Sequence, residues 1–202
     1  VSVVLESGDV FVGDLVRGTD EGSIGSDPHQ GRATTHYFSE DPKADVFALE
    51  TLVNDGGTIA DSGTGTLSVS TGSLSNNGGT IATNGALAIE GGPISNRGGT
   101  LAAQSRATIY ASSLDNSAGG QITAQAVSIA DTGAFNNASG TVRADGTLGV
   151  AAQTIANDGG AIANAGTGTT AVTATGTLTN TAGGLIGGNG DTSVSAGSID
   201  NR

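Results

Sequence analysis

Residues 74–113 read LSNNGGTIATNGALAIEGGP and then ISNRGGTLAAQSRATIYASS, which are two stretches of 20 residues with one layout. Each stretch opens with an apolar residue, has Asn two places later, and passes through a Gly-Gly pair to an alternating apolar segment. The Gly pair is a turn signal, and the alternation is typical of strands. These residues therefore predict a repeated unit of strands and turns.

The same unit recurs from residue 52 onward, with steps of 22, 20, 20, 21, 20, 23 and 21 between the leading apolar residues. Each unit is expected to hold three short strands and three corners. Units of about 21 residues with small corner residues favour a parallel β-helix, in which each coil pairs with its neighbours. The predicted fold is all-β: a right-handed parallel β-helix (β-solenoid) of about seven coils with an irregular N-terminal cap or excursion.

The Asn of the unit is expected to have a structural role. Stacked coils place these side chains in register, and an amide can bond to the same amide one coil away. Such a ladder also satisfies polar groups that would otherwise be buried without partners. The predicted ladder consists of Asn54, Asn76, Asn96, Asn116, Asn137, Asn157, Asn180 and Asn201. The residue after each Asn varies, which indicates a solvated corner.

Composition excludes several classes of protein. The chain has 35 Gly and no Trp, Met or Cys, and each interior Gly costs a helix about 1 kcal/mol relative to Ala. The net charge of −12 repels phosphate backbones, so no nucleic-acid partner is predicted. No apolar run approaches the roughly 20 residues of a membrane span, so no membrane insertion by this segment is expected. The first residue is Val1, and the chain ends within a repeat, which predicts a segment of a longer protein.

Residues 1–51 differ from residues 52–202 in composition. They hold ten of the nineteen acids, both His and the only Lys, but six of the 35 Gly. We therefore predict a non-repeat N-terminal segment over 1–51 and β-helix repeats over 52–202. A polar loop is expected at about 17–45. The favoured interpretation is an irregular first coil or cap that covers the edge of the stack.

An alternative interpretation makes this loop a recognition element, since binding residues concentrate in loops on rigid scaffolds. Its candidate residues are His29, His36, Tyr37 and Phe38. A metal site that joins His29 and His36 to Asp27 or Glu40 matches no specific ligand spacing. No metal site and no other cofactor is therefore predicted.

Catalysis is not predicted for the repeats, which contain no His and no Lys. Asp61, Asp145 and Asp191 lie at offsets 9, 10 and 13 from the leading apolar residue, so they form no obvious acid pair. The sequence GGNGD at 187–191 approaches a calcium-binding repeat once only. A carbohydrate-active β-helix enzyme is thus the least favoured hypothesis.

The two units quoted above and LDNSAGGQITAQAVSIADTGA (114–134) resemble the repeats of filamentous haemagglutinin-like exoproteins. These are the secreted partners of two-partner secretion systems, a family that includes haemagglutinin-repeat adhesins and contact-dependent growth-inhibition toxins. The resemblance covers residues 52–202. It implies a β-helical stalk that is exported unfolded through an outer-membrane transporter and displayed at the surface of a Gram-negative bacterium.

The resemblance implies a structural stalk segment that acts in adhesion, biofilm formation or contact-dependent toxin delivery, with no catalysis of its own. The partners that it implies are the two-partner-secretion transporter during export and a receptor or glycan on a host cell or neighbouring bacterium. The alternative function is a receptor- or glycan-binding segment of the same filament that uses residues 1–51.

Overall fold

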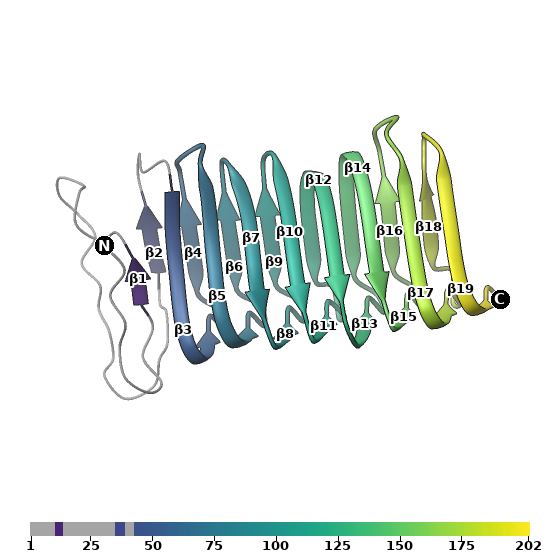
Figure 1. The fold of residues 1–202 in the computed structure, drawn as a ribbon, viewed down its shortest axis with the longest axis horizontal. Helices are drawn as coiled ribbons and strands as arrows, with labels where there is room; N and C mark the ends of the chain where they lie inside the picture. Colours follow the sequence, from purple (N-terminus) through teal and green to yellow (C-terminus); the bar gives the residue numbers. More distant parts are fainter. Residues whose placement is uncertain (1–10, 14–34, 39–42) are drawn as a thin grey trace.

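The computed structural model describes residues 11–13, 35–38 and 43–202, with side chains from residue 51 onward. These residues form a β-solenoid of about seven turns with no helix (Figure 1). In Figure 1 the chain ascends on the far face and descends on the near face while it advances towards the C-terminus. This path is a right-handed coil. The predicted all-β right-handed solenoid is confirmed.

Two broad faces carry most of the strands. The far face holds the short strands β4 (Thr58–Asp61), β6 (Thr80–Thr83), β9 (Thr100–Ala103), β16 (Ala161–Asn164) and β18 (Leu185–Gly188). The near face holds β5 (Thr66–Ser75), β7 (Ala86–Gly91), β10 (Arg106–Ala111), β17 (Thr170–Thr179) and β19 (Thr192–Asp200). Two strands cover both faces, namely β12 (Gln121–Asp131) and β14 (Thr141–Ala152). A third, shorter side holds β8 (Pro93–Ser95), β11 (Ser113–Asp115), β13 (Ala134–Asn136) and β15 (Thr154–Ala156).

Not every coil has the three separate strands that the sequence predicts. β12 bends through the corner between the two faces, with a register shift between Ala124 and Ala126. β17 bends through the next corner, with a shift between Ala174 and Thr177. At each of these corners the strand bends at an irregularity and its pairing resumes beyond it.

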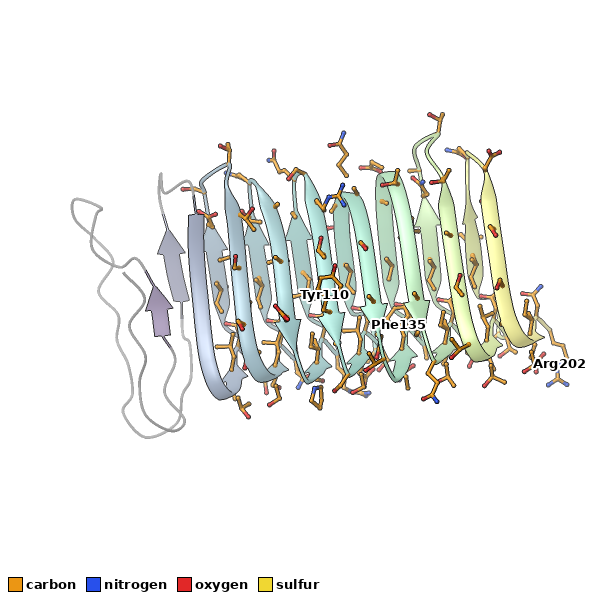
Figure 2. The ribbon with its side chains drawn as sticks, viewed as in Figure 1. Tyr110, Phe135 and Arg202 are labelled. Atoms are coloured by element: carbon orange, nitrogen blue, oxygen red, sulfur yellow. The ribbon has the colours of Figure 1, made fainter. Side chains whose placement is uncertain are left out.

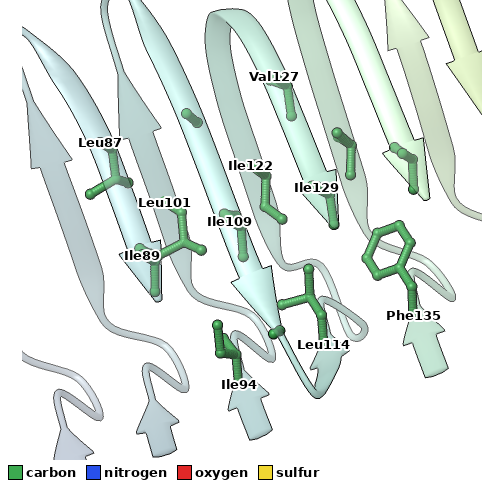
Figure 3. Packing of buried hydrophobic residues seen from close by; sticks show 14 of the residues in the cluster. Leu87, Ile89, Ile94, Leu101, Ile109, Leu114, Ile122, Val127, Ile129 and Phe135 are labelled. Atoms are coloured by element: carbon green, nitrogen blue, oxygen red, sulfur yellow. The ribbon is translucent and has the colours of Figure 1, made fainter. Parts of the chain in front are cut away.

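The coils stack in parallel with like residues in register. Ile59 pairs with Ile81, and Ile81 pairs with Leu101. From residue 51 onward, where side chains are described, the inward residues form one continuous core of Leu, Ile, Val, Ala and a single Phe, Phe135 (Figure 3). We number the coils by the apolar residue two places before each Asn. Coils one to seven open at Leu52, Leu74, Ile94, Leu114, Phe135, Ile155 and Leu178.

One additional rung precedes coil one. β2 (Thr35–Phe38) pairs in parallel with β4, and β3 (Lys43–Val53) pairs in parallel with β5. β1 (Phe11–Gly13) pairs antiparallel with β3, on the edge that β5 does not use. β3 therefore runs across the composition boundary that the sequence places at residue 51.

The loop expected at about 17–45 is interrupted by β2 and by the start of β3. The stretch THYF, residues 35–38, is rich in β-branched and aromatic residues, which suit a strand beside the open edge of β4. It lacks the preceding Asn and Gly pair, so the repeat motif does not include it. The rest of the expected loop up to residue 42 lies outside the described residues.

Thr170 is a buried polar residue whose replacement is expected to stabilise the chain. It pairs with Leu148 in the register of the inward column, and it is 1% exposed. Its hydroxyl has no hydrogen-bond partner within the described part of the chain. We expect Thr170→Val to raise the free energy of unfolding by about 1 kcal/mol, because a methyl group replaces an unsatisfied buried hydroxyl. Urea denaturation measures this change, and a loss of stability would show that the hydroxyl is satisfied in solution.

Candidate functional site

The Asn side chains lie inside the corner that follows the strand on the third, shorter side of the solenoid. Asn54, Asn76, Asn96, Asn116, Asn137 and Asn157 are fully buried. Each Nδ2 donates to the Oδ1 of the Asn in the next coil, over 2.6 Å from Asn54 to Asn76 and 2.7 Å at the remaining six steps as far as Asn201. The structure thus places all eight predicted residues in one hydrogen-bonded column.

Each amide of the column from Asn54 to Asn180 also donates to backbone carbonyl groups. The Nδ2 of Asn76 donates to the carbonyl of Gly79 in its own coil, at 3.2 Å, and to the carbonyl of Thr100 in the next, at 3.3 Å. Every donor points towards the C-terminal coil, so the column has a direction. At its N-terminal end the Oδ1 of Asn54 is buried with no partner among the described residues. The column therefore fixes both the corner and the spacing of adjacent coils.

The corner after the Asn requires a left-handed residue. In coils one, two, three and six this residue is Gly, with φ of 65° at Gly56, 61° at Gly78, 60° at Gly98 and 64° at Gly159. Coil five places Ser139 there, with φ of 57°. A side chain in this conformation costs about 1–2 kcal/mol, which explains why Gly is the common choice.

A second set of hydrogen bonds runs along the outside of the same corner, and we call it the outer corner ladder. The Oδ1 of Asp55 accepts from the hydroxyl of Ser75 and from the backbone N–H of Asn77, both at 2.7 Å. The Oδ1 of Asn77 accepts in turn from Ser95, at 2.7 Å, and from the N–H of Arg97, at 3.2 Å. The side chain of the residue after one Asn thus accepts hydrogen bonds from the two residues that flank the next Asn.

Arg97 continues the outer corner ladder with a different chemistry. It forms an ion pair with Asp115 at 3.0 Å and donates to the hydroxyl of Ser117 at 2.8 Å. Asn136 then donates to Asp115 at 3.2 Å. Figure 2 shows polar side chains along this lower edge. The sequence prediction of a merely solvated corner missed these bonds.

Hydrogen bonds lower the pKa of two carboxylates in the outer corner ladder. For Asp158, the backbone N–H and the hydroxyl of Thr181 hold the pKa below its ordinary value. For Asp115, burial raises the pKa, but hydrogen bonds from Ser117 and Arg97 together outweigh burial and lower it. Both groups therefore contribute stability that is lost as the pH falls through their lowered pKa values.

Asp131, at the end of β12, behaves in the opposite way. It is 7% exposed, its Oδ1 accepts from the N–H of Gly133 at 2.7 Å, and its Oδ2 has no partner among the described residues. Burial raises its pKa above the ordinary value. The folded chain thus holds this proton more tightly than the unfolded chain, and the contribution of Asp131 to stability falls as the pH rises from the unfolded pKa through the folded one.

We therefore expect Asp131→Asn to stabilise the chain at neutral pH and to have less effect in acid. At about pH 7 the free energy of unfolding should rise by about 1 kcal/mol, because the amide removes a buried charge and keeps the acceptor for Gly133. At about pH 3 both side chains are uncharged, so the difference should shrink. Denaturant unfolding of both proteins across this range measures it. An equal difference at all pH values would contradict the assignment.

The predicted recognition residues do not form a described loop. His36, Tyr37 and Phe38 lie in β2, whose register pairs them with Ile59, Ala60 and Asp61. His29 lies outside the described residues. Their role in recognition stays a prediction.

The three acids considered as a possible catalytic group lie in different environments. Asp61 is buried and accepts from the N–H of Gly63 at 2.8 Å and from Thr83 at 3.2 Å. Asp145 is exposed and pairs with Arg143 at 2.9 Å, and Asp191 is exposed. No group of three His, Cys, Asp or Glu residues that could hold a metal ion occurs in the described part of the chain.

The exposed face of β10 carries one aromatic side chain. Tyr110 is 54% exposed, and Figure 2 shows it on the near face. It pairs in register with Glu90 on one side and with Ala130 on the other. A flat ring beside a carboxylate is chemistry that could contact a sugar. The sequence marks Tyr110 only as the single Tyr of the repeats.

The fold and the Asn column define a class of protein: an extended repeat scaffold whose buried polar groups hold one coil to the next. The family model for the haemagglutinin repeat matches residues 51–139, 126–182 and 167–202. The chain belongs to the haemagglutinin-repeat family, and the resemblance seen in the sequence is confirmed. Neither a search of curated proteins nor a search of solved structures found a significant match. Within 11–13, 35–38 and 43–202, no helix has the length and apolarity to cross a membrane.

Proposed function

We propose that this chain is a structural stalk segment of a large secreted surface exoprotein. It spaces a distal binding or toxic module from the cell, in adhesion or in contact-dependent toxin delivery, and performs no catalysis. The observation that carries this proposal is the continuous Asn column, which runs through all seven coils with donor-acceptor distances of 2.6–2.7 Å. Such a column links each coil to the next and suits a rod that must keep its length.

The family match supports the cellular setting. Haemagglutinin-repeat proteins are secreted surface adhesins. We propose that an outer-membrane two-partner-secretion transporter of a Gram-negative cell exports this chain unfolded, and that the coils form outside the cell. Stacking of like coils supplies the stability that one coil lacks, because each repeat buries its apolar face only against its neighbours.

A second candidate function is binding of a receptor or glycan by this segment itself. The observation that favours it is the exposed ring of Tyr110 beside Glu90. Residues 1–51, with His29, are the other place where such a determinant could lie. The partner in either case is a receptor or glycan on a host cell or a neighbouring bacterium.

A binding screen separates these proposals. The full chain is tested against intact epithelial and bacterial cells and a glycan array, beside Tyr110→Ala and a version that lacks residues 1–34. The deletion keeps β2 and β3, so the rung that pairs with β4 and β5 remains. Thr108→Ala, which changes the position two residues before Tyr110 on the same face of β10, is the control for Tyr110→Ala.

If the chain acts only as a stalk, none of the proteins should bind. Far-UV circular dichroism should show that all of them are folded. Binding that Tyr110→Ala abolishes would place the determinant on the near face. Binding lost only with residues 1–34 would place it in the N-terminal segment. Cleavage of any glycan by the full chain would overturn the non-catalytic role.

A further inference from the structure

Residues 131–156 carry three departures from the pattern of the other coils. The segment begins at the end of β12, includes β13 and β14, and ends with β15. The first adds a buried carboxyl oxygen without a partner, the second adds backbone strain, and the third removes hydrogen bonds between coils. Together they concentrate weakness at one place inside the rod.

The first departure is Asp131. Its Oδ2 is buried and has no partner in the described part of the chain, and Ala111 stands beside it in the register of β10. Position 131 is thus the one site of this inward column, Thr71, Gly91, Ala111, Asp131, Ala152 and Ala174, at which a described carboxylate stands. A buried group without a partner costs stability that a neighbouring Ala does not.

The second departure is Ser139. It occupies the left-handed corner position at φ 57°, where coils one, two, three and six have Gly. Coil four has a longer corner in which Ala118, at φ 56°, is followed by Gly119 at φ 85°. Ser139 therefore stores backbone strain in the shorter corner, without a second left-handed Gly to share the turn.

The third departure is a gap in the outer corner ladder. Ala138 stands where coil one has Asp55, and Ala156 stands where coil two has Ser75. Neither methyl group can form the bonds of 2.7 Å that join Asp55 to coil two. Asn137 and Asn157 still bond at 2.7 Å on the inside, so the joint keeps its ladder but lacks the outer bonds.

We propose that residues 131–156 are a yielding segment, which opens locally before the coils of residues 74–113. Those coils have Gly at the left-handed position and a continuous outer corner ladder from Asn77 to Arg97. In a repeat protein each coil contacts only its neighbours, so a weak junction lets the two sides fluctuate separately. A rod with this junction opens first at residues 131–156, while the remaining coils stay folded.

The pH controls the opening through Asp131. From β10 the residue beside it is Ala111, and Tyr110 before it points outward. β13 has no ionisable residue, Asp115 of β11 is paired with Arg97, and Arg143 and Asp145 of β14 pair with each other. The backbone N–H groups of Gly133 and Leu114 lower the pKa of Asp131, but burial outweighs them. No cation among the described residues offsets the charge of Asp131, so the segment opens more as that carboxyl loses its proton.

Hydrogen exchange of the full chain, read by mass spectrometry, tests the proposal. After correction for intrinsic rates, peptides of 131–156 should exchange about tenfold faster at neutral pH than peptides of 74–113. Ser139→Gly and Asp131→Asn should each slow exchange of the segment severalfold and leave 74–113 unchanged. The excess of the exchange rate of 131–156 over that of 74–113 should shrink in acid for the natural chain. It should stay constant with pH for Asp131→Asn.

Ala182→Gly is the matched control for Ser139→Gly, because it places Gly at a left-handed corner position, φ 52°, whose corner bonds to Gly159, outside the segment. It should leave exchange of 131–156 unchanged. Equal protection of 131–156 and 74–113 in the natural chain would overturn the proposal. So would an equal slowing of both regions by Ser139→Gly, since the segment would then open only with the whole rod.

Discussion

Asn116→Leu is expected to lower the free energy of unfolding by about 3–5 kcal/mol. The Nδ2 of Asn116 donates to the Oδ1 of Asn137 at 2.7 Å and to the carbonyls of Gly120 and Thr141 at 3.1 and 3.2 Å. Its Oδ1 accepts from Asn96 at 2.7 Å. Leu removes all four bonds inside a fully buried corner, so polar groups of three coils lose partners at once. Chemical denaturation followed by circular dichroism measures the loss.

The control for this substitution is Asn84→Leu, which makes the same chemical change at an exposed corner. Asn84 donates to the carbonyl of Ser62 at 3.1 Å, where water can replace it. Its replacement should cost less than about 0.5 kcal/mol. A loss of that small size at Asn116 would show that the buried column contributes nothing to stability.

The fold could be predicted because the informative residues repeat. Leu74 and Ile94 begin successive units, and Asn76 and Asn96 occupy the same place in both. The structure then pairs each with its counterpart one coil away. In a solenoid, like residues at a fixed spacing along the chain come into contact in successive coils. The recurring Asn therefore predicts the column directly.

The outer corner ladder could not be predicted in this way, because its members are complementary and not identical. Asp55 accepts from Asn77, whereas Arg97 donates to Asp115. A search for like residues at a fixed spacing reads such a column as variable. Pairing donors with acceptors across one repeat length would have found it.

The additional rung escaped prediction for a related reason. β2 pairs with β4 through backbone bonds, which need no particular side chain, and the Asn and Gly pair that mark the other coils are missing before Thr35. The unpartnered Oδ2 of Asp131 was equally hidden, since the sequence alone does not tell which carboxyl of a strand faces inward without a partner. These features depend on neighbours that only the assembled coil provides.

Gly79→Ala is expected to destabilise the chain by about 3 kcal/mol or more, although it adds a single methyl group. That methyl group would overlap the backbone carbonyl oxygen of Asn54 and would stand 2.6 Å from the Oδ1 of Asn76. The carbonyl belongs to the coil below and cannot move without breaking the stack. The backbone and side chains of the Asn column therefore leave no room for a side chain at residue 79, so the second residue of the pair must be Gly.

Gly78→Ala is the matched control for Gly79→Ala. Gly78 has φ of 61°, and a methyl group there meets no atom within 4 Å, so its cost is the backbone strain alone, about 1 kcal/mol. Thermal and chemical unfolding of the two variants should therefore differ by about 2 kcal/mol although they are adjacent in the chain. If Gly79→Ala folds and costs no more than Gly78→Ala, the coils can separate enough to admit a side chain, and close stacking of the corner on the Asn column is wrong. If Gly79→Ala does not fold while Gly78→Ala does, the distinction between packing and conformation within one Gly pair stands.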